Sequence, residues 1–369
     1  LTIWVYPKNR YLGLESNQNS SMRFKIVDVG QESYADPHYR IPRSGLRLRC
    51  VQRINNAAGC TCSSLFHNAW TQRQRCCSYL FIQRHPKNFF WLAEIVSEIT
   101  MNAFEFHCPT KIICGEGALH KLPVKIADRG VTKPLIVTDS NLMKLGIAEQ
   151  VFAPLKEADV NYSLYDRVPP DSSLNVVNEV AELYKEEKCD GWIALGGGSV
   201  IDTAKGAAAS VSVGEKDFTD LQGSEVLQNE LDPLIAIPTT AGTGSEVTLV
   251  AVVADTEHHA KLSYTSYRLV PHIAFLDPKL TASLPPKLTA TTGIDALTHA
   301  IEAYTSIQKN PISDALAQQA ISLISKNLAK SCAKPGDLEA RTNLALGSLL
   351  AGASFSNAMV GLVHAIGHS

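Results

Sequence analysis

Four side chains near the end of the sequence have the types and spacing of metal ligands. Asp295 and His299 are four residues apart, so on a helix they would project from one face toward a single ion. His364 and His368 repeat that spacing in an otherwise apolar segment, where two buried imidazoles are unusual without a ligand. A carboxylate with imidazoles suits Fe(II) or Zn(II) better than Mg²⁺ or Ca²⁺, and does not separate iron from zinc. The pattern predicts a divalent metal site, although an isolated D-x3-H pair is also common as a cap or a solvated pair.

A glycine-rich turn at residues 196–199 (GGGS) suggests a second chemistry. Glycines let backbone N–H groups approach an anion closely, and the N-terminus of the following helix favours negative charge. The turn is neither the G-x-G-x-x-G fingerprint, because Ile201 replaces the third glycine, nor a P-loop. Alone it is equally compatible with an ordinary tight turn between a strand and a helix.

Two other predicted strands end in polar or small residues. Residues 134–138 run into Asp139, and residues 234–238 run into the stretch 239–245 (TTAGTGS). Three such strand ends in sequence order favour a pyrophosphate site over three unrelated turns. A carboxylate at Asp139 would accept a ribose hydroxyl and repel a 2'-phosphate, which favours NAD over NADP. Asp139 is also compatible with a turn or helix cap.

The elements that would position these residues alternate in type from Met101 onward. Short β-branched runs, such as 191–195, alternate with amphipathic segments, such as 176–188, as in a parallel sheet covered by helices. Ala-, Leu- and Ser-rich segments of helical length follow the last strand. We predict an α/β N-terminal dinucleotide-binding domain with a parallel, Rossmann-like sheet at residues 101–278, followed by an all-helical metal-binding domain at 279–369.

Composition limits the class of protein. The 369 residues are 45% hydrophobic with a formal net charge of -2, so two cored domains are expected and a nucleic-acid partner is not. No uninterrupted apolar stretch reaches the roughly 18 residues of a membrane helix. We therefore expect a cytoplasmic enzyme with no membrane or nucleic-acid partner.

The first hundred residues differ from the rest. They carry a net charge of +7, against -9 for the remainder, and show no sustained helical period or clean strand alternation. We interpret residues 1–100 as a non-native or unstructured upstream segment, with Met101 as the natural start. The alternatives are a basic arm or a small zinc domain; the spacing of the candidate zinc ligands is poor, and they are Cys60, Cys62, His67, Cys76 and Cys77.

From Met101 to the last residue the sequence resembles the iron-containing (group III) alcohol dehydrogenases. The resemblance lies in four ordered stretches: 196–206 (GGGSVIDTAKG), 237–248 (IPTTAGTGSEVT), 293–306 (GIDALTHAIEAYTS) and 361–369 (GLVHAIGHS). It implies a metal-dependent alcohol dehydrogenase or aldehyde reductase that transfers hydride between an alcohol and NAD, with NADP less favoured. The metal would be Fe(II), or alternatively Zn(II).

The resemblance also implies roles for individual residues. Asp295, His299 and His364 would ligate the metal, and His368 would lie beside the nicotinamide as a catalytic residue that helps to move the proton. The residues that would line the cofactor are Asp139, Gly197, Gly198, Ser199, Asp202, Thr239, Thr240, Thr248 and Lys261. Lys261 lies in an undistinctive segment and is equally compatible with a solvated surface residue.

One departure from the family is a fourth metal ligand, a histidine further along the chain, which the sequence does not reach. We expect from this a C-terminally truncated fragment that binds metal weakly and has little activity. Two alternatives remain: a zinc-dependent glycerol dehydrogenase or dehydroquinate synthase-like enzyme, and an inactive nucleotide-binding fragment. The resemblance suggests a homodimer, with strand pairing near residues 111–113. The cysteines after Met101 have no metal spacing and are expected to be reduced structural thiols: Cys108, Cys114, Cys189 and Cys332.

Overall fold

The computed structural model describes residues 103–214, 223–225, 227–258 and 260–367, together with the backbone of three short strands before them. The chain divides into two units, Leu1–Phe104 and Glu105–Ser369. All residues discussed below as candidate ligands or cofactor contacts belong to the second unit, except that His368 lies outside the described residues. The possible zinc ligands at Cys60, Cys62, His67, Cys76 and Cys77 also lie outside them.

The first unit contains a small antiparallel sheet in the order β1-β2-β3, formed by β1 (Trp4–Val5), β2 (Arg10–Ser16) and β3 (Met22–Asp28). We expected no clean strand alternation before Met101, and for these segments that expectation was wrong. The sequence of β3, MRFKIVD, begins with apolar and charged residues in alternation, which is the period of a strand. The signal spans too few residues to stand out from the irregular sequence around it.

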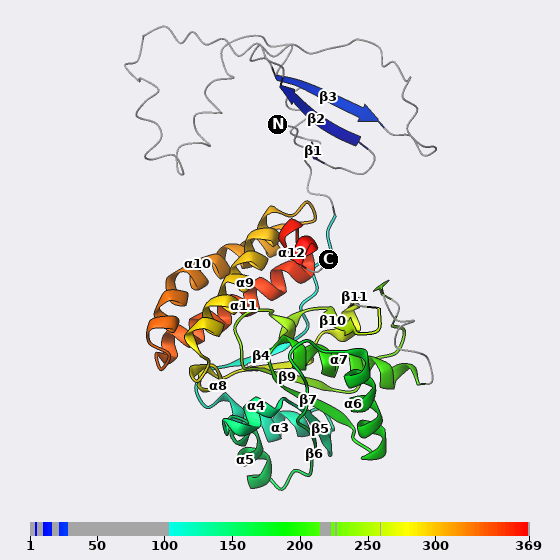
Figure 1. Cartoon of the computed structure of the whole chain (residues 1–369), viewed down its shortest axis with the longest axis vertical. Coiled ribbons are helices and arrows are strands. Elements are labelled where there is room, and N and C mark those ends of the chain that lie inside the picture. The colour runs from blue at the N-terminus through cyan, green and yellow to red at the C-terminus, as the bar shows by residue number, and fades with distance from the viewer. Residues whose placement is uncertain are drawn as a thin grey trace. The chain divides into compact units, whose positions relative to one another are not determined.

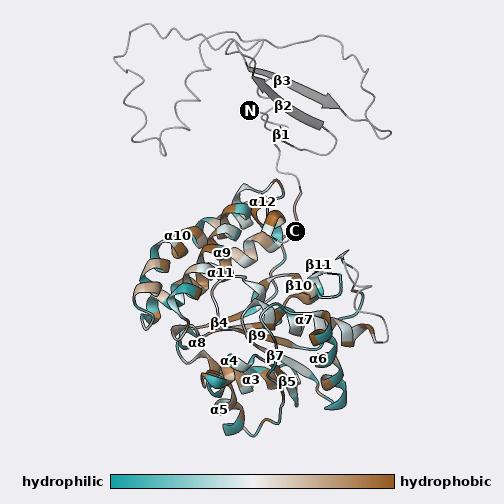
Figure 2. Ribbon diagram, viewed as in Figure 1, coloured by the Kyte–Doolittle hydropathy of each residue, from teal (hydrophilic) through white to brown (hydrophobic). Residues whose placement is uncertain are grey.

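The second unit is built on a six-stranded parallel sheet (Figure 1). Its strand order is β4-β12-β9-β7-β5-β6, and the strands are β4 (Lys111–Cys114), β5 (Pro134–Val137), β6 (Ser163–Tyr165), β7 (Gly191–Gly196), β9 (Leu234–Pro238) and β12 (Ile273–Leu276). This confirms the predicted parallel α/β fold. The central strands are short apolar runs because helices cover both of their faces, and Figure 2 shows these apolar residues along β7 and β9.

Alternate residues of the central strands fill two separate cores. Trp192 and Ala194 of β7 face one core, which also contains side chains of α6 and α7. Ile193 and Leu195 face the other core, together with side chains of α3 and α5. The helices of this part are α3 (Leu122–Ala127), α4 (Ser140–Lys144), α5 (Glu149–Glu157), α6 (Leu174–Glu186) and α7 (Gly198–Val213), with the 3-10 turn η2 (Ala118–Lys121).

A second, smaller sheet has the order β10-β11-β8; β8 precedes β9 in the chain, and β10 and β11 lie between β9 and β12. It contains β8 (Gly223–Ser224), β10 (Val250–Asp255) and β11 (Ala260–Thr265), with β10 and β11 antiparallel. The 3-10 turns η4 (Ser245–Val247) and η5 (Tyr267–Leu269) flank this hairpin. This hairpin was not predicted from the sequence.

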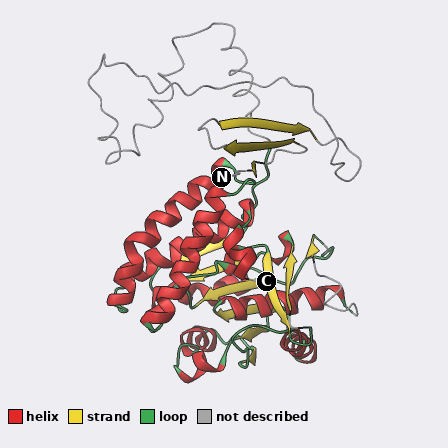
Figure 3. Ribbon diagram, turned by 45° about the horizontal axis from the view of Figure 1, so that its top comes forward, coloured by secondary structure: helices red, strands yellow, loops and turns green. Residues whose placement is uncertain are grey.

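After β12 the described chain is helical (Figure 3). The helices are α8 (Pro278–Ala282), α9 (Pro286–Thr305), α10 (Pro311–Ala333), α11 (Leu338–Ala358) and α12 (Leu362–Gly367). Small residues such as Ala296, Ala300 and Ala320 let α9, α10 and α11 pack closely. Asn310 caps α10 in a capping box with Ser313, which fixes where that helix begins. None of the helices described here has both the length and the hydrophobicity that a membrane crossing requires.

Candidate functional site

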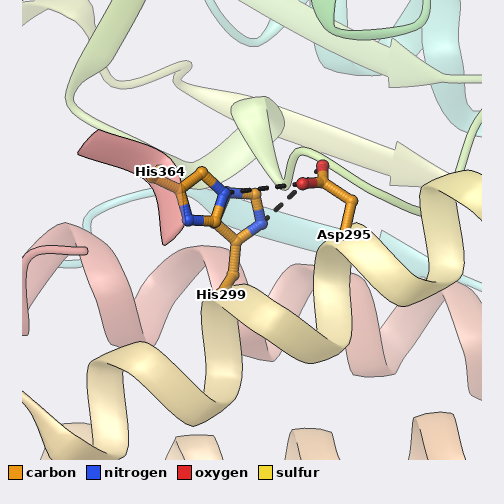
Figure 4. Close-up of side chains that lie close together, drawn as sticks. All are labelled: Asp295, His299 and His364. Atoms are coloured by element: carbon orange, nitrogen blue, oxygen red, sulfur yellow. Dashed lines mark ion pairs between the residues drawn. The ribbon is translucent and has the colours of Figure 1, made fainter. Parts of the chain in front are cut away.

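Three of the predicted metal ligands lie together in space. Asp295 and His299 project from α9, and His364 reaches them from α12 (Figure 4). One candidate ligand atom from each lies within 4.8 Å of the other two. The His364 Nε2 atom is 3.5 Å from Asp295 Oδ1, and His299 Nδ1 is 4.0 Å from Asp295 Oδ2. A carboxylate and two imidazoles are a donor set that a divalent transition metal accepts.

The surroundings of His299 fit a bound cation. Its side chain is 8% exposed, and its ring stacks between Phe355 and His364, with centroids 4.5 and 4.1 Å away. Burial lowers the pKa of His299 to about 4, so the imidazole is neutral and has a lone pair to donate. Its Nδ1 atom is buried and makes no hydrogen bond to the described part of the protein. An orphaned buried nitrogen is costly unless another group binds it, and a cation beside Asp295 would do so.

The glycine-rich turn lies where β7 meets α7. Gly197 is the N-cap of α7 and no side chain caps this helix, so the N–H groups of its first turn are available to an anion. A Cβ atom at Gly198 would lie 2.6 Å from Cγ2 of Thr243. Glycine is therefore required here for the close approach of the following loop. The half-buried Thr240 lies close to Gly197, where an added Cβ atom would be 3.3 Å from Cγ2 of Thr240.

Asp139 lies at the carboxyl end of β5, the strand that pairs with β7. Its Oδ1 accepts hydrogen bonds from the backbone N–H groups of Asn141 and Leu142, at 2.8 and 3.0 Å. Asp139 is thus the N-cap of α4, one of the two roles that the sequence left open. The same strand-edge position is where a ribose would lie in a dinucleotide fold.

Two of the predicted cofactor residues make internal contacts. Asp202 accepts a hydrogen bond from Ser245 Oγ at 2.6 Å and another from the backbone N–H of Val252 at 3.1 Å. Thr248 is 2% exposed, and its carbonyl and hydroxyl oxygens both accept hydrogen bonds from Lys205 Nζ, at 2.8 and 3.1 Å. These contacts fasten α7 to η4 and β10, so Asp202 and Thr248 shape the edge of the predicted cofactor site.

Lys261 and Thr239 occupy different places. Lys261 Nζ lies 3.7 Å from Asp171 Oδ1, and its side chain is 44% exposed. The backbone N–H of Asp171 in turn donates to Ser199 Oγ at 3.2 Å, which brings Lys261 near the α7 N-terminus. Thr239 is buried, and its backbone N–H donates to the carbonyl oxygen of Gly196. It joins the ends of β9 and β7.

One loop, residues 239–245, contacts both candidate sites. Thr240 and Thr243 lie against the glycine-rich turn, as described above. On its other side, Gly242 packs against Thr292 of α9 and makes a backbone hydrogen bond with His299. Ala241 belongs to the same small-residue core as Ala296 and Ala300. The glycine-rich turn and the candidate metal ligands are therefore neighbours, separated by a single loop.

Three buried charged residues near these sites were not predicted. Glu302 contacts His364 and is treated below; it lies three and seven residues after His299 and Asp295, so helical spacing would have placed it on their face. Lys205 and Glu246 are fully or almost fully buried. Burial lowers the pKa of Lys205 to about 8 and raises the pKa of Glu246 to about 7. Only tertiary structure buries this pair, so periodicity carries no signal for it.

Glu246 gives a testable pH dependence of stability. Because its folded-state pKa is about 7 against an ordinary 4.5, its favourable contribution is complete below pH 4.5 and is lost as the pH rises through about 7. We expect Glu246→Gln to gain stability relative to the parent over that interval, by up to about 3 kcal/mol. Urea unfolding across the interval measures this. Parallel stability curves for parent and variant would show that Glu246 ionises normally.

Two families match the chain in sequence order. Residues 109–278 match the family described as "Iron-containing alcohol dehydrogenase". Residues 289–369 match the one described as "Fe-containing alcohol dehydrogenase family, C-terminal". The matches contain both the glycine-rich turn and the three clustered ligands.

Individual proteins are similar over the same region. The chain is 43% identical over 263 residues to the choline dehydrogenase of Bacillus subtilis (strain 168), covering 71% of this chain and 65% of that protein. It is 38% identical over 263 residues to the NAD-dependent methanol dehydrogenase of Bacillus methanolicus, covering 71% and 69%. The solved structure of an alcohol dehydrogenase from Oenococcus oeni is 42% identical with a TM-score of 0.70, covering 72% of this chain and 70% of that one. The chain thus spans less than two thirds of the length of the first of these relatives.

Proposed function

The chain belongs to the iron-containing alcohol dehydrogenase family, and on that premise we propose that the protein transfers hydride between an alcohol and NAD. In the oxidative direction the alcohol carbon gives hydride to NAD⁺ and its hydroxyl gives up a proton, which yields an aldehyde or ketone and NADH. The observation that carries the proposal is the convergence of Asp295, His299 and His364 beside the loop that packs on the glycine-rich turn. A dehydrogenase needs its cofactor and its substrate to meet at such a place.

The three clustered residues would hold the metal. Fe(II) is the ion that the family's name favours, with Zn(II) as the alternative. A divalent ion there would supply Lewis acidity toward the alcohol or aldehyde oxygen. The buried, neutral imidazole of His299 and the carboxylate of Asp295 would fix where that ion can lie, and the rings of Phe355 and His364 stack on the His299 ring and hold it in place. His368, four residues after His364, is the proposed residue for proton movement.

The first turn of α7 would hold the pyrophosphate of NAD. Gly197, Gly198 and Ser199 offer backbone N–H groups at an uncapped helix N-terminus, and Thr240 and Lys261 lie at its margin. Asp139 caps α4 through Oδ1, which leaves Oδ2 to accept a hydrogen bond from a ribose hydroxyl. Asp202, Thr239 and Thr248 would support this site through the internal hydrogen bonds described above.

Asp139→Ser tests the preference for NAD. Serine caps a helix about as well as aspartate, so the fold of α4 should persist while the negative charge is removed. We expect the ratio of NADP to NAD affinity to rise at least about tenfold, which corresponds to about 1.4 kcal/mol. Titration of both dinucleotides, followed by protein fluorescence, gives the ratio. An unchanged ratio with an unchanged melting temperature would remove Asp139 from the cofactor site.

Turnover tests the proposed function directly. The protein, purified without oxygen and loaded separately with Fe(II) and Zn(II), is incubated with NAD and a series of primary alcohols, and NADH is followed by absorbance. Asp295→Asn is the matched control, because it removes the charge of one candidate ligand at nearly constant volume. Metal-dependent NADH formation that Asp295→Asn abolishes supports the proposal. NAD binding without metal binding would instead favour a non-catalytic nucleotide-binding protein.

The matching families favour this activity over a zinc-dependent glycerol dehydrogenase or a dehydroquinate synthase-like enzyme. We also propose a homodimer. β4 is an edge strand of the described sheet, since it pairs with β12 alone, and edge strands are places where two subunits can join. Light scattering of the purified protein reports the oligomeric state.

A further inference from the structure

Glu302 accepts hydrogen bonds from three N–H groups of the segment that carries His364. The backbone N–H groups of Gly361 and Val363 donate to Oε2 and Oε1, at 2.9 and 2.6 Å. The ring atom Nδ1 of His364 lies 2.6 Å from Oε2. The side chains of Glu302 and His364 are both only 9% exposed. This carboxylate therefore makes charge-assisted hydrogen bonds in a nearly water-free place, where they are strongest.

Apolar packing does little to position the segment. Helix α12 has no buried residue within its described length, and its apolar side chains Leu362 and Ile366 are 73% and 65% exposed. Its contacts within the described chain are chiefly with α9. Among the described contacts of His364 and its segment with α9, the bonds to Glu302 are the shortest, next to the 3.5 Å approach of Asp295 and the ring stacking on His299.

The contact with Nδ1 also decides which nitrogen of His364 faces the ligand cluster. An ionised carboxylate accepts hydrogen bonds and cannot donate one, so Nδ1 carries the proton. In a neutral imidazole this leaves the lone pair on Nε2, the atom that lies 3.5 Å from Asp295 Oδ1. Histidines that bind metals commonly donate their other N–H to a carboxylate, which fixes the tautomer and the orientation of the ring.

We propose that Glu302 is the positioning residue of the candidate metal centre: it anchors the 361–364 segment to α9 and fixes His364 with Nε2 directed at the ion. The inference rests on the proposed function, because it presupposes the metal. Glu302 is not itself a ligand in this arrangement. Both of its oxygens are occupied by N–H groups, and it is absent from the cluster of candidate ligands found among the described residues.

Glu302→Gln tests the proposal through metal affinity, with no need for turnover. Glutamine keeps the shape but replaces one oxygen by an NH₂ group, which opposes either the Val363 N–H or the His364 Nδ1–H. Loss of such a supporting carboxylate weakens metal binding about 10- to 100-fold, and we expect that loss for Zn(II), measured by competition with a chromophoric chelator. In the Co(II)-loaded protein the visible absorption spectrum should change shape, and the midpoint of the Co(II) titration should shift to higher metal concentration. Glu339→Gln, an exposed carboxylate at the start of α11, is the matched control and should bind both metals as the parent does.

A double-mutant cycle separates a positioning role from a general loss of structure. If Glu302 acts through His364, Glu302→Gln has no further effect on Zn(II) affinity in a His364→Ala background. A full effect of Glu302→Gln in that background would overturn the proposal in favour of direct ligation or general destabilisation. Parent-like affinity in Glu302→Gln alone would also overturn it.

The tautomer provides a second test that uses the parent protein, so it holds even if Glu302→Gln does not fold. ¹⁵N NMR of the Zn(II)-loaded, histidine-labelled protein should show His364 protonated at Nδ1. Protonation at Nε2 would overturn the proposal. Failure of the metal centre itself is distinguishable, since Asp295→Asn and His299→Ala would then leave Zn(II) affinity unchanged.

Discussion

His299→Ala is expected to weaken Zn(II) binding about 100- to 1000-fold and to abolish metal-dependent alcohol oxidation. A structural zinc site is worth about 10–16 kcal/mol over four ligands, so one ligand contributes about 3 kcal/mol or more. His299 has a further reason to matter, because its buried Nδ1 has no hydrogen-bond partner in the described structure. That nitrogen is placed to donate its lone pair to a cation beside Asp295.

Chelator competition for Zn(II) and NADH formation measure the two effects. His120→Ala removes an exposed imidazole from η2 and should leave both unchanged. Thermal unfolding of the metal-free proteins controls for the cavity that alanine leaves beside Phe355. Normal Zn(II) affinity in a folded His299→Ala protein would contradict the metal centre and the dehydrogenase function with it.

Gly244→Ala is expected to destabilise the protein by about 2–5 kcal/mol. Gly244 has a φ of +64°, and a Cβ there would lie 2.7 Å from the Cα of Gly352 and 3.1 Å from the carbonyl oxygen of Ser348, both in α11. The left-handed backbone costs an alanine about 1–2 kcal/mol. Overpacking against backbone that cannot yield costs about 1–3 kcal/mol more.

Gly146→Ala is the matched control for this substitution. Gly146 has a φ of +68°, yet a Cβ there would meet nothing within 4 Å, so only the backbone cost applies. The difference between the two variants in urea unfolding isolates the contact between the 239–245 loop and α11. Equal losses would mean that this contact is loose. A larger loss for Gly244→Ala would show that α11 holds the loop in place.

Local patterns predicted much of this molecule. The helical spacing of Asp295 and His299 needs only one helix, and the strand ends at Asp139 and residues 196–199 need only the alternation of strands with helices. Both kinds of signal lie within a few residues of sequence. The fold class was therefore predictable, as was the pairing of Asp295 with His299 on one helical face.

Long-range contacts explain what was not predicted. Lys205 can be buried because three oxygens of Thr248 and Val250 accept hydrogen bonds from it. These acceptors lie more than forty residues away in the sequence, so no local periodicity indicates the burial. The internal use of Asp202 depends on the β10–β11 hairpin, whose strands were missed. Glu302 is different, since it shares a helical face with Asp295 and His299. Its helical spacing therefore did carry a signal in the sequence.

The strand order of the large sheet bears on how the protein is made. Within the described sheet β4 pairs with β12 alone, Lys111 opposite Ile273. The first strand of this unit in chain order can therefore pair only after the last strand has been synthesised. A nascent chain on the ribosome therefore exposes the backbone edge of β4 that pairs with β12 until Leu276 has emerged, and such non-local pairing folds slowly. During synthesis this unpaired backbone edge is a place where another chain could pair.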